Sequence, residues 1–80
     1  MPQFYFNIRK GDALLKDPEG AEFMSVDAAR DEAIAATREI MSEQIGRGEF
    51  PEPNSCFEIN DDGGRLVLTV SFDEALAPKS

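Results

Sequence analysis

Residues 25–47, SVDAARDEAIAATREIMSEQIGR, decide the fold because they separate two segments of a different pattern. The stretch is rich in Ala, Glu, Arg, Ile and Met, and it contains neither Gly nor Pro before Gly46. It opens on Ser25, whose hydroxyl can cap the first turn of a helix. These features predict one long helix from Val26 to about Arg47.

The predicted helix has one broad apolar face. At the helical repeat this face consists of Val26, Ala29, Ala33, Ala36, Thr37, Ile40 and Met41, with Ile34 and Ile45 on one flank. Alanine side chains let a helix backbone approach a neighbouring layer closely. The helix is therefore expected to lie on a sheet.

The segment before the helix predicts a β-hairpin. Apolar and polar side chains alternate from Phe4 to Arg9, which is typical of a half-buried strand with Phe4, Phe6 and Ile8 inward. A turn at residues 10–12 leads to a second short strand at residues 13–16. The Asp-Pro-Glu-Gly turn at residues 17–20 ends this strand, and a loop anchored by Phe23 follows.

The segment after the helix predicts a second hairpin. The proline-rich residues 50–54 form the connection. Apolar and polar side chains alternate again at residues 56–60, which predicts a strand. Asp-Asp-Gly-Gly at residues 61–64 predicts a hairpin turn, and residues 65–72 predict the second strand of this hairpin. In the returning strand Leu66, Leu68, Val70 and Phe72 are expected inward, and Val67, Thr69 and Ser71 outward. A Ser-x-x-Glu capping box predicts a short helical turn at residues 73–77, whose Leu76 covers an edge of the core.

The predicted fold is a single α+β domain spanning residues 1–80. Two β-hairpins form one mainly antiparallel four-stranded sheet with one long helix on one face, in the order β-β-α-β-β, followed by a short C-terminal helical turn. The sequence leaves the strand order open. The hairpins can pair through their outer edges, or the last strand can lie at the centre.

Composition excludes several classes of function. Eight Lys and Arg against sixteen Asp and Glu give a net charge of −8, and histidine is absent. Such a chain is poorly suited to phosphate backbones or anionic lipids, and it lacks the commonest general base and zinc ligand. A single cysteine, no leader of basic and apolar residues, and no apolar run of membrane-spanning length predict a cytoplasmic protein without membrane contact.

Three features can carry chemistry, and each has a simpler structural explanation. The acids of the segment Asp12–Glu22 can ligate calcium or magnesium, but they lack EF-hand spacing and suit turns. The paired acids at 31–32, 61–62 and 73–74 belong to polar surfaces or turns, and Cys56 has no cation beside it in sequence. No catalytic, cofactor-binding or metal-ligating residue is therefore predicted, and a non-enzymatic protein is expected.

The sheet face without a helix is the predicted interaction face. Its candidate residues are Tyr5, Asn7, Arg9, Val67 and Thr69. The expected function is that of a small interaction or accessory protein, which binds an unknown protein partner through this face or forms a homodimer. One alternative is a nucleic-acid-associated regulator of antitoxin-like type, although the net charge of −8 opposes binding to nucleic acid. Another is a metal binder that uses Asp12–Glu22.

The whole chain resembles a family of short, acidic, uncharacterised bacterial proteins, a domain of unknown function. The resemblance rests on the opening MPQFYFNIRKGD at residues 1–12 and on DPEGAE at 17–22. The helix start at 27–33 and the second hairpin at 57–72 also fit the family. The resemblance implies the architecture and a bacterial cytoplasmic protein, and it carries no activity. It draws attention to Arg30, which is expected to reach an acid of the preceding loop.

Overall fold

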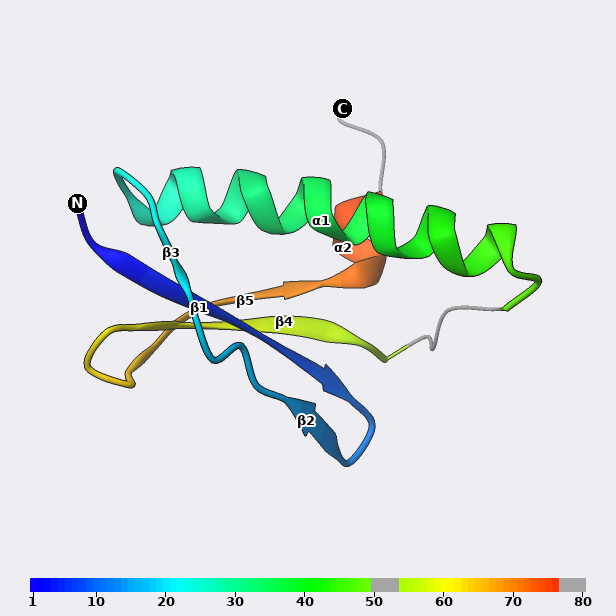
Figure 1. Ribbon diagram of the computed structural model, residues 1–80, viewed down its shortest axis with the longest axis horizontal. Coiled ribbons are helices and arrows are strands. Elements are labelled where there is room, and N and C mark those ends of the chain that lie inside the picture. Colours follow the sequence, from blue (N-terminus) through cyan, green and yellow to red (C-terminus); the bar gives the residue numbers. More distant parts are fainter. Residues whose placement is uncertain (50–53, 77–80) are drawn as a thin grey trace.

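An antiparallel sheet and two helices form the structure, which is a computed structural model (Figure 1). It describes residues 1–49 and 54–76. Along the chain the elements are β1 (Gln3–Lys10), β2 (Ala13–Leu15), β3 (Ala21–Glu22), α1 (Val26–Gly46), β4 (Cys56–Asp61), β5 (Leu66–Ser71) and α2 (Phe72–Leu76). The predicted α+β class, both hairpins and the long helix are confirmed.

The two hairpins join through their first strands. The strand order is β2-β1-β4-β5, and β1 pairs antiparallel with β4 from Phe4↔Asp61 to Arg9↔Cys56. The last strand therefore lies at an edge. The two-residue strand β3, at the position where the sequence predicts a loop, pairs with the start of β1 on the same side as β2.

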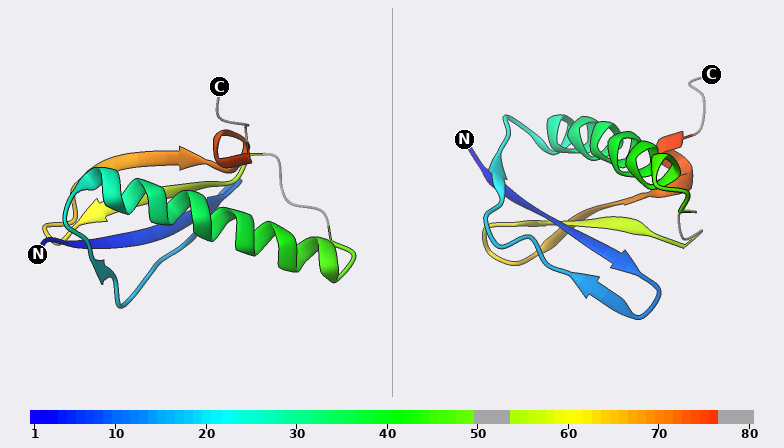
Figure 2. Two further views of the ribbon diagram at one scale, coloured as in Figure 1. Left: turned by 90° about the horizontal axis from the view of Figure 1, so that it is seen from above. Right: turned by 45° about the vertical axis from the view of Figure 1, so that its right-hand side comes forward.

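The core lies between the sheet and the two helices (Figure 2). Its fully or nearly fully buried apolar side chains are Phe4, Ala29, Ala33, Phe57, Ile59, Val70, Phe72 and Ala75. Phe57 packs against both Phe6 and Phe72, and Phe23 packs against Phe4 and Phe6 as the predicted loop anchor. These five phenylalanines thus form one connected cluster within the core.

Helix α1 begins where the sequence predicts. The Ser25 Oγ accepts a hydrogen bond of 3.1 Å from the Ala28 N–H. Ala29, Ala33 and Thr37 are buried in the middle of the predicted apolar face, but Val26 and Ile45 near the two ends are exposed. Among the described residues, the helix extends beyond the layer it covers, which leaves these side chains at its ends exposed.

A β-bulge reverses the predicted faces at the start of β5. Asn60 pairs with Leu66 and Ile59 pairs with Leu68, so Val67 is an extra residue in the ladder. Leu66, expected inward, is 56% exposed, whereas Val67, expected outward, packs against the core. Strict alternation fails here because a bulge shifts the side-chain period by one residue.

The short helix α2 follows β5 directly. The Ser71 Oγ accepts from the Glu74 N–H at 3.0 Å, as the predicted capping box requires, although the helix starts one residue earlier, at Phe72. The predicted end of this turn at residue 77 and the role predicted for the Leu76 side chain lie outside what the structure describes. Arg30 forms an ion pair with Glu74, so the expectation that it reaches an acid in the loop before α1 is wrong.

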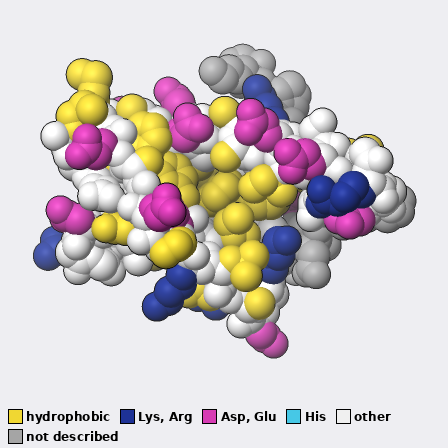
Figure 3. Space-filling model, in the orientation of Figure 1, with side chains coloured by type: hydrophobic (Ala, Val, Ile, Leu, Met, Phe, Trp, Pro, Cys, Tyr) yellow, Lys and Arg dark blue, Asp and Glu magenta, His cyan; other side chains and the backbone are white. Residues whose placement is uncertain are grey.

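Helix α1 covers only part of the inner sheet face. Its main contacts are with β5 and α2, and β2 lies away from it in Figure 1 and in the right-hand view of Figure 2. Leu15 pairs with Ile8 on β1 and is 52% exposed. Figure 3 shows hydrophobic side chains at the surface below the helix. The inner face beside β2 is therefore an apolar surface that the helix does not reach.

Candidate interaction site on the outer sheet face

The outer face of the sheet carries most of the predicted interaction residues. Tyr5, Asn7 and Arg9 alternate with the inward side chains of β1, and Thr69 is exposed on β5, where it pairs with Glu58. Val67 is not part of this surface because the bulge turns it toward the core. Four of the five predicted residues thus share one face.

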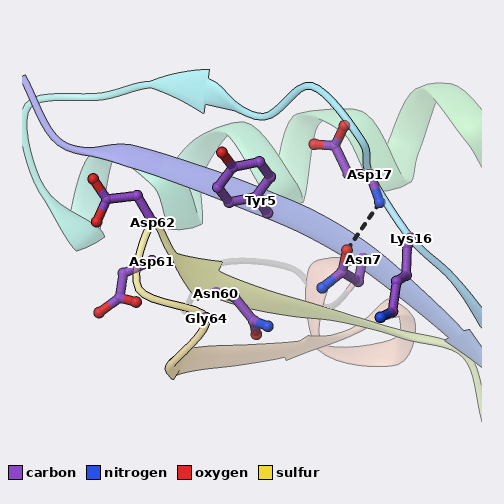
Figure 4. Close-up of a pocket in the computed structure, with 8 residues that line it drawn as sticks. All are labelled: Tyr5, Asn7, Lys16, Asp17, Asn60, Asp61, Asp62 and Gly64. Carbon is purple, nitrogen blue, oxygen red and sulfur yellow. Dashed lines mark hydrogen bonds between the residues drawn. The ribbon is translucent and has the colours of Figure 1, made fainter.

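A hollow of about 240 Å³ lies on this face, between the strands and two loops (Figure 4). It is lined by Tyr5, Asn7, Lys16, Asp17, Asn60, Asp61, Asp62 and Gly64. The predicted residues Arg9 and Thr69 lie outside it. Asn60 enters the site because it pairs directly with Tyr5 across β1 and β4.

Asn7 is the most buried polar residue of the hollow. It is only 7% exposed, and its Oδ1 accepts a hydrogen bond of 2.9 Å from the Asp17 N–H. A backbone N–H can only donate, so this bond fixes the amide orientation. The Nδ2 group then points away from Asp17 toward the hollow, as Figure 4 shows. No hydrogen bond from Nδ2 to a residue within 1–49 or 54–76 is formed.

Asp17 holds the loop that forms one wall of the hollow. Its Oδ2 accepts from the Phe6 N–H at 3.1 Å, and its Oδ1 accepts from the N–H groups of Glu19 and Gly20. The Phe6 amide faces the gap where β2 has ended and β3 has not begun, so the carboxylate replaces a strand partner. Partial burial by itself raises the pKa of Asp17, but the three N–H donors together lower it below its ordinary value.

Gly20 lets this loop lie against β1. Its φ of +70° suits glycine, and a Cβ built at this position lies 2.9 Å from both the Phe4 carbonyl oxygen and Cε2 of the Tyr5 ring. Any side chain larger than hydrogen would therefore move the loop or the tyrosine. The family-like Asp-x-Glu-Gly turn thus serves to position Tyr5 and Asn7.

The charged groups of the hollow that are not taken up by backbone N–H groups lie at opposite ends, since the Asp17 carboxylate beside Asn7 accepts three such bonds. Asp61 and Asp62 come from the β4–β5 turn, and Lys16 comes from the end of β2, with Tyr5 between them (Figure 4). The Asp61 Oδ1 is occupied by the N–H groups of Gly63 and Arg65. Asp62 is exposed. The hollow therefore offers hydrogen-bond donors at the end near Asn7 and carboxylate acceptors at the other.

An ion pair occupies the neighbouring part of the outer face. Arg9 Nε lies 2.9 Å from Glu58 Oε2, and this contact raises the pKa of Arg9 and lowers that of Glu58. Burial, and then the Glu58 charge, raise the pKa of the nearby Cys56 thiol. A raised pKa disfavours the reactive thiolate, which agrees with the structural role expected for this cysteine.

The acidic segment Asp12–Glu22 does not converge on a common point. The two oxygens of Asp17 are engaged by backbone N–H groups. Within residues 1–49 and 54–76, no three acidic or thiol side chains are arranged to hold a metal ion. The same part of the chain has no helix with the length and hydropathy needed to cross a membrane.

Six residues of the hollow were not predicted as part of the interaction face, namely Lys16, Asp17, Asn60, Asp61, Asp62 and Gly64. Alternation along β4 does put Asn60 on the outer face. Its place beside Tyr5, however, depends on the pairing of β1 with β4, and the sequence left that pairing open. The site could have been identified from the sequence only if the strand order had been known.

These features define a small α+β domain with a polar site on the uncovered face of an antiparallel sheet. The chain belongs to the family DUF6894, a domain of unknown function, whose model matches residues 3–73. The family resemblance inferred from the sequence is thereby confirmed. No curated protein and no solved structure matches the chain.

Proposed function

We propose that the protein is a non-enzymatic interaction or accessory protein of the cytoplasm, and that a protein partner binds to the outer sheet face at the hollow. The observation that carries the proposal is Asn7, which is 7% exposed and directs its Nδ2 group toward the hollow. The Nδ2 group forms no hydrogen bond with a described residue and is open to the hollow, so it is available to an acceptor on a ligand. A peptide carbonyl is such an acceptor.

The size of the hollow supports a protein partner over a metabolite. A volume of about 240 Å³ is below the roughly 300–1,000 Å³ typical of small-molecule sites. It suits one side chain and its adjoining peptide group. The surrounding outer face, with Arg9, Glu58 and Thr69, then supplies additional contact surface.

The chemistry of the lining residues also favours binding over catalysis. The pKa of the lining residue Asp17 is lowered by its backbone N–H donors, which makes its carboxylate a weaker base. The carboxylates in the hollow give the nucleic-acid alternative no support, because phosphates bind to Lys and Arg.

Site-specific photo-crosslinking in cells tests this proposal. A photoreactive amino acid at Thr69, on the outer face, is expected to capture a discrete partner protein. The same residue at Ala35, an exposed position on α1, is the matched control. Equal capture at both positions, or capture at Ala35 alone, would contradict the proposal.

A homodimer is a second candidate, and the exposed Leu15 favours it. A second copy suits the uncovered inner face because a basic residue on β1 and acidic residues on α1 border that face. Lys10 follows Phe6 and Ile8 on the inner side of β1. The exposed Glu39 and Glu43 lie on the flank of α1 opposite Arg30, which faces α2. A twofold axis across the apolar surface brings Lys10 of each copy toward these acids of the other.

Light scattering across a concentration series tests the homodimer. The protein is expected to reach dimer mass, and Leu15→Glu is expected to return it to monomer mass. Leu66→Glu, at an equally exposed leucine on the far edge strand, is the control and should leave the dimer intact. A monomer at all concentrations would exclude this candidate and leave the outer-face proposal unaffected.

A further inference from the structure

We infer that the hollow binds an arginine side chain of the partner, with the guanidinium group at the Asp61–Asp62 end and the arginine's own carbonyl at the Asn7 end. This inference rests on the proposed function and specifies the chemistry of its ligand. It follows from two separate observations, the orientation of the buried Asn7 amide and the distribution of charge along the hollow.

The Asn7 end accepts a carbonyl oxygen. The Asn7 Nδ2 group is turned toward the hollow because its Oδ1 is held by the Asp17 N–H at 2.9 Å. The Lys16 ammonium group lies beside it and adds a second donor (Figure 4). The Asp17 carboxylate at this end is engaged by three backbone N–H groups, whereas Asp61 and Asp62 at the other end have a free carboxylate oxygen, so the cationic part of a ligand belongs at that other end.

The opposite end accepts a cation. Asp62 is exposed and Asp61 keeps one oxygen free of the turn bonds from Gly63 and Arg65. The Tyr5 ring lies between the two ends, where a guanidinium or its stem can pack on an aromatic face. The net charge of −8 also attracts a basic partner over a longer range.

The separation of the two ends requires a long side chain. Asn7 and the Phe4–Asp61 pair are three residues apart along β1, which corresponds to about 10 Å at the rise of a strand. Arginine can extend from its carbonyl over Tyr5 to the carboxylates, whereas a short basic side chain cannot. A planar guanidinium also matches carboxylates with two parallel hydrogen bonds, which favours arginine over lysine.

A metal ion fits the hollow less well than an organic cation. Within residues 1–49 and 54–76, no three acidic side chains are arranged to hold one. The donors of Asn7 and Lys16 at the other end would also have no role.

The test is an NMR titration of the ¹⁵N-labelled full chain, which observes the side-chain amides of Asn7 and Asn60 directly. The probes are three capped amino acids used at millimolar concentration in low salt. Acetyl-arginine methylamide is expected to shift both side-chain amides. Acetyl-citrulline methylamide, which lacks the charge, and acetyl-diaminopropionic acid methylamide, which is too short, are expected to bind more weakly.

Two variants test whether the Asp62 carboxylate binds the guanidinium group of the probe. Asp62→Asn is expected to weaken binding of the arginine probe about two- to fivefold, the fold-change that corresponds to an exposed ion pair. Asp31→Asn, the same charge change at an exposed position on α1, is the control and should leave affinity unchanged. Both side chains are exposed, so both variants should fold.

The outcomes separate this inference from the proposed function. Equal binding of the arginine and citrulline probes, or no effect of Asp62→Asn, overturns the arginine inference and leaves the outer-face proposal intact. If no probe shifts the side-chain amides but a partner is still captured at Thr69, the arginine inference is likewise overturned and the outer-face proposal stands. Loss of capture at Thr69 overturns the proposed function itself.

Discussion

Single residues of the Asp17–Gly20 turn determine the shape of the candidate site. Asp17 satisfies three backbone N–H groups, and Gly20 permits contact between the loop and Tyr5. Neither residue needs a ligand to explain it. Their role in the site is indirect, because they hold Tyr5 and Asn7 in position.

Gly20→Ala is expected to destabilise the protein more than Gly11→Ala. Both glycines have positive φ, so each substitution carries a backbone cost of about 1–2 kcal/mol. Only Gly20 also has atoms within 3 Å of the added Cβ, whereas nothing lies within 4 Å at Gly11. Urea unfolding of both variants measures the difference. Equal destabilisation would mean that the loop moves away from Tyr5 at no cost.

Asp17→Asn is expected to lower the free energy of unfolding by about 1–3 kcal/mol at pH 7, because a charge-assisted hydrogen bond to Phe6 is replaced by two opposed donors. The pKa of Asp17 is lowered in the folded state from its ordinary 3.8. Its contribution is therefore full above that value and is lost as the pH falls through the lower folded pKa.

The measurement for Asp17 is urea unfolding as a function of pH. The wild type should lose stability toward acid more steeply than Asp17→Asn, so the difference between them shrinks below pH 4. A constant difference across this range would show that the carboxylate charge is unimportant. Asp12→Asn, in the exposed β1–β2 turn, is the matched control.

At the scale of elements, the bulge in β5 determines which side chains reach the core. Leu66→Lys is expected to change stability by less than about 0.5 kcal/mol, whereas Val67→Lys is expected to cost about 1–3 kcal/mol. The physical reason is that Val67 packs against the core and Leu66 is 56% exposed. Thermal unfolding of the pair checks this, and the reverse ranking would indicate a regular strand without the bulge.

Local patterns in the sequence predicted the elements because alternation and capping act over a few residues. Phe4 and Phe57 are buried, and Ser25 and Ser71 cap their helices as expected. Features that depend on distant parts of the chain were missed. The strand β3 is only two residues long, the bulge at Val67 shifts the alternation, and the partner of Arg30 belongs to α2.

The candidate site was predicted in part for the same reason. Tyr5 and Asn7 follow from alternation along β1 alone. Lys16, Asn60 and Asp62 join them only after β4 pairs with β1 and the Asp17 loop folds back. No local sequence pattern predicts that these residues lie close together in the fold.

At the scale of the whole molecule, the net charge of −8 opposes the compact state. Raising NaCl from about 10 mM to about 300 mM screens this repulsion and is expected to raise Tm by about 2–4 °C. Glu32→Lys, at an exposed position, should raise Tm at low salt and reduce the salt effect. A Tm that falls with salt would mean that ion pairs such as Arg9–Glu58 dominate.

The central pairing of β1 with β4 has a consequence for how the chain folds. It joins residues as distant as Phe4 and Asp61, and it brings Phe4, Phe6 and Phe57 together on one face of the sheet. Neither hairpin can form this core alone. The chain must therefore lose the entropy of closing the long loop between β1 and β4 before most of the stabilising contacts can form. Folding is therefore expected to be one cooperative step that is slow for a chain of this length, with no stable half-molecule on the way.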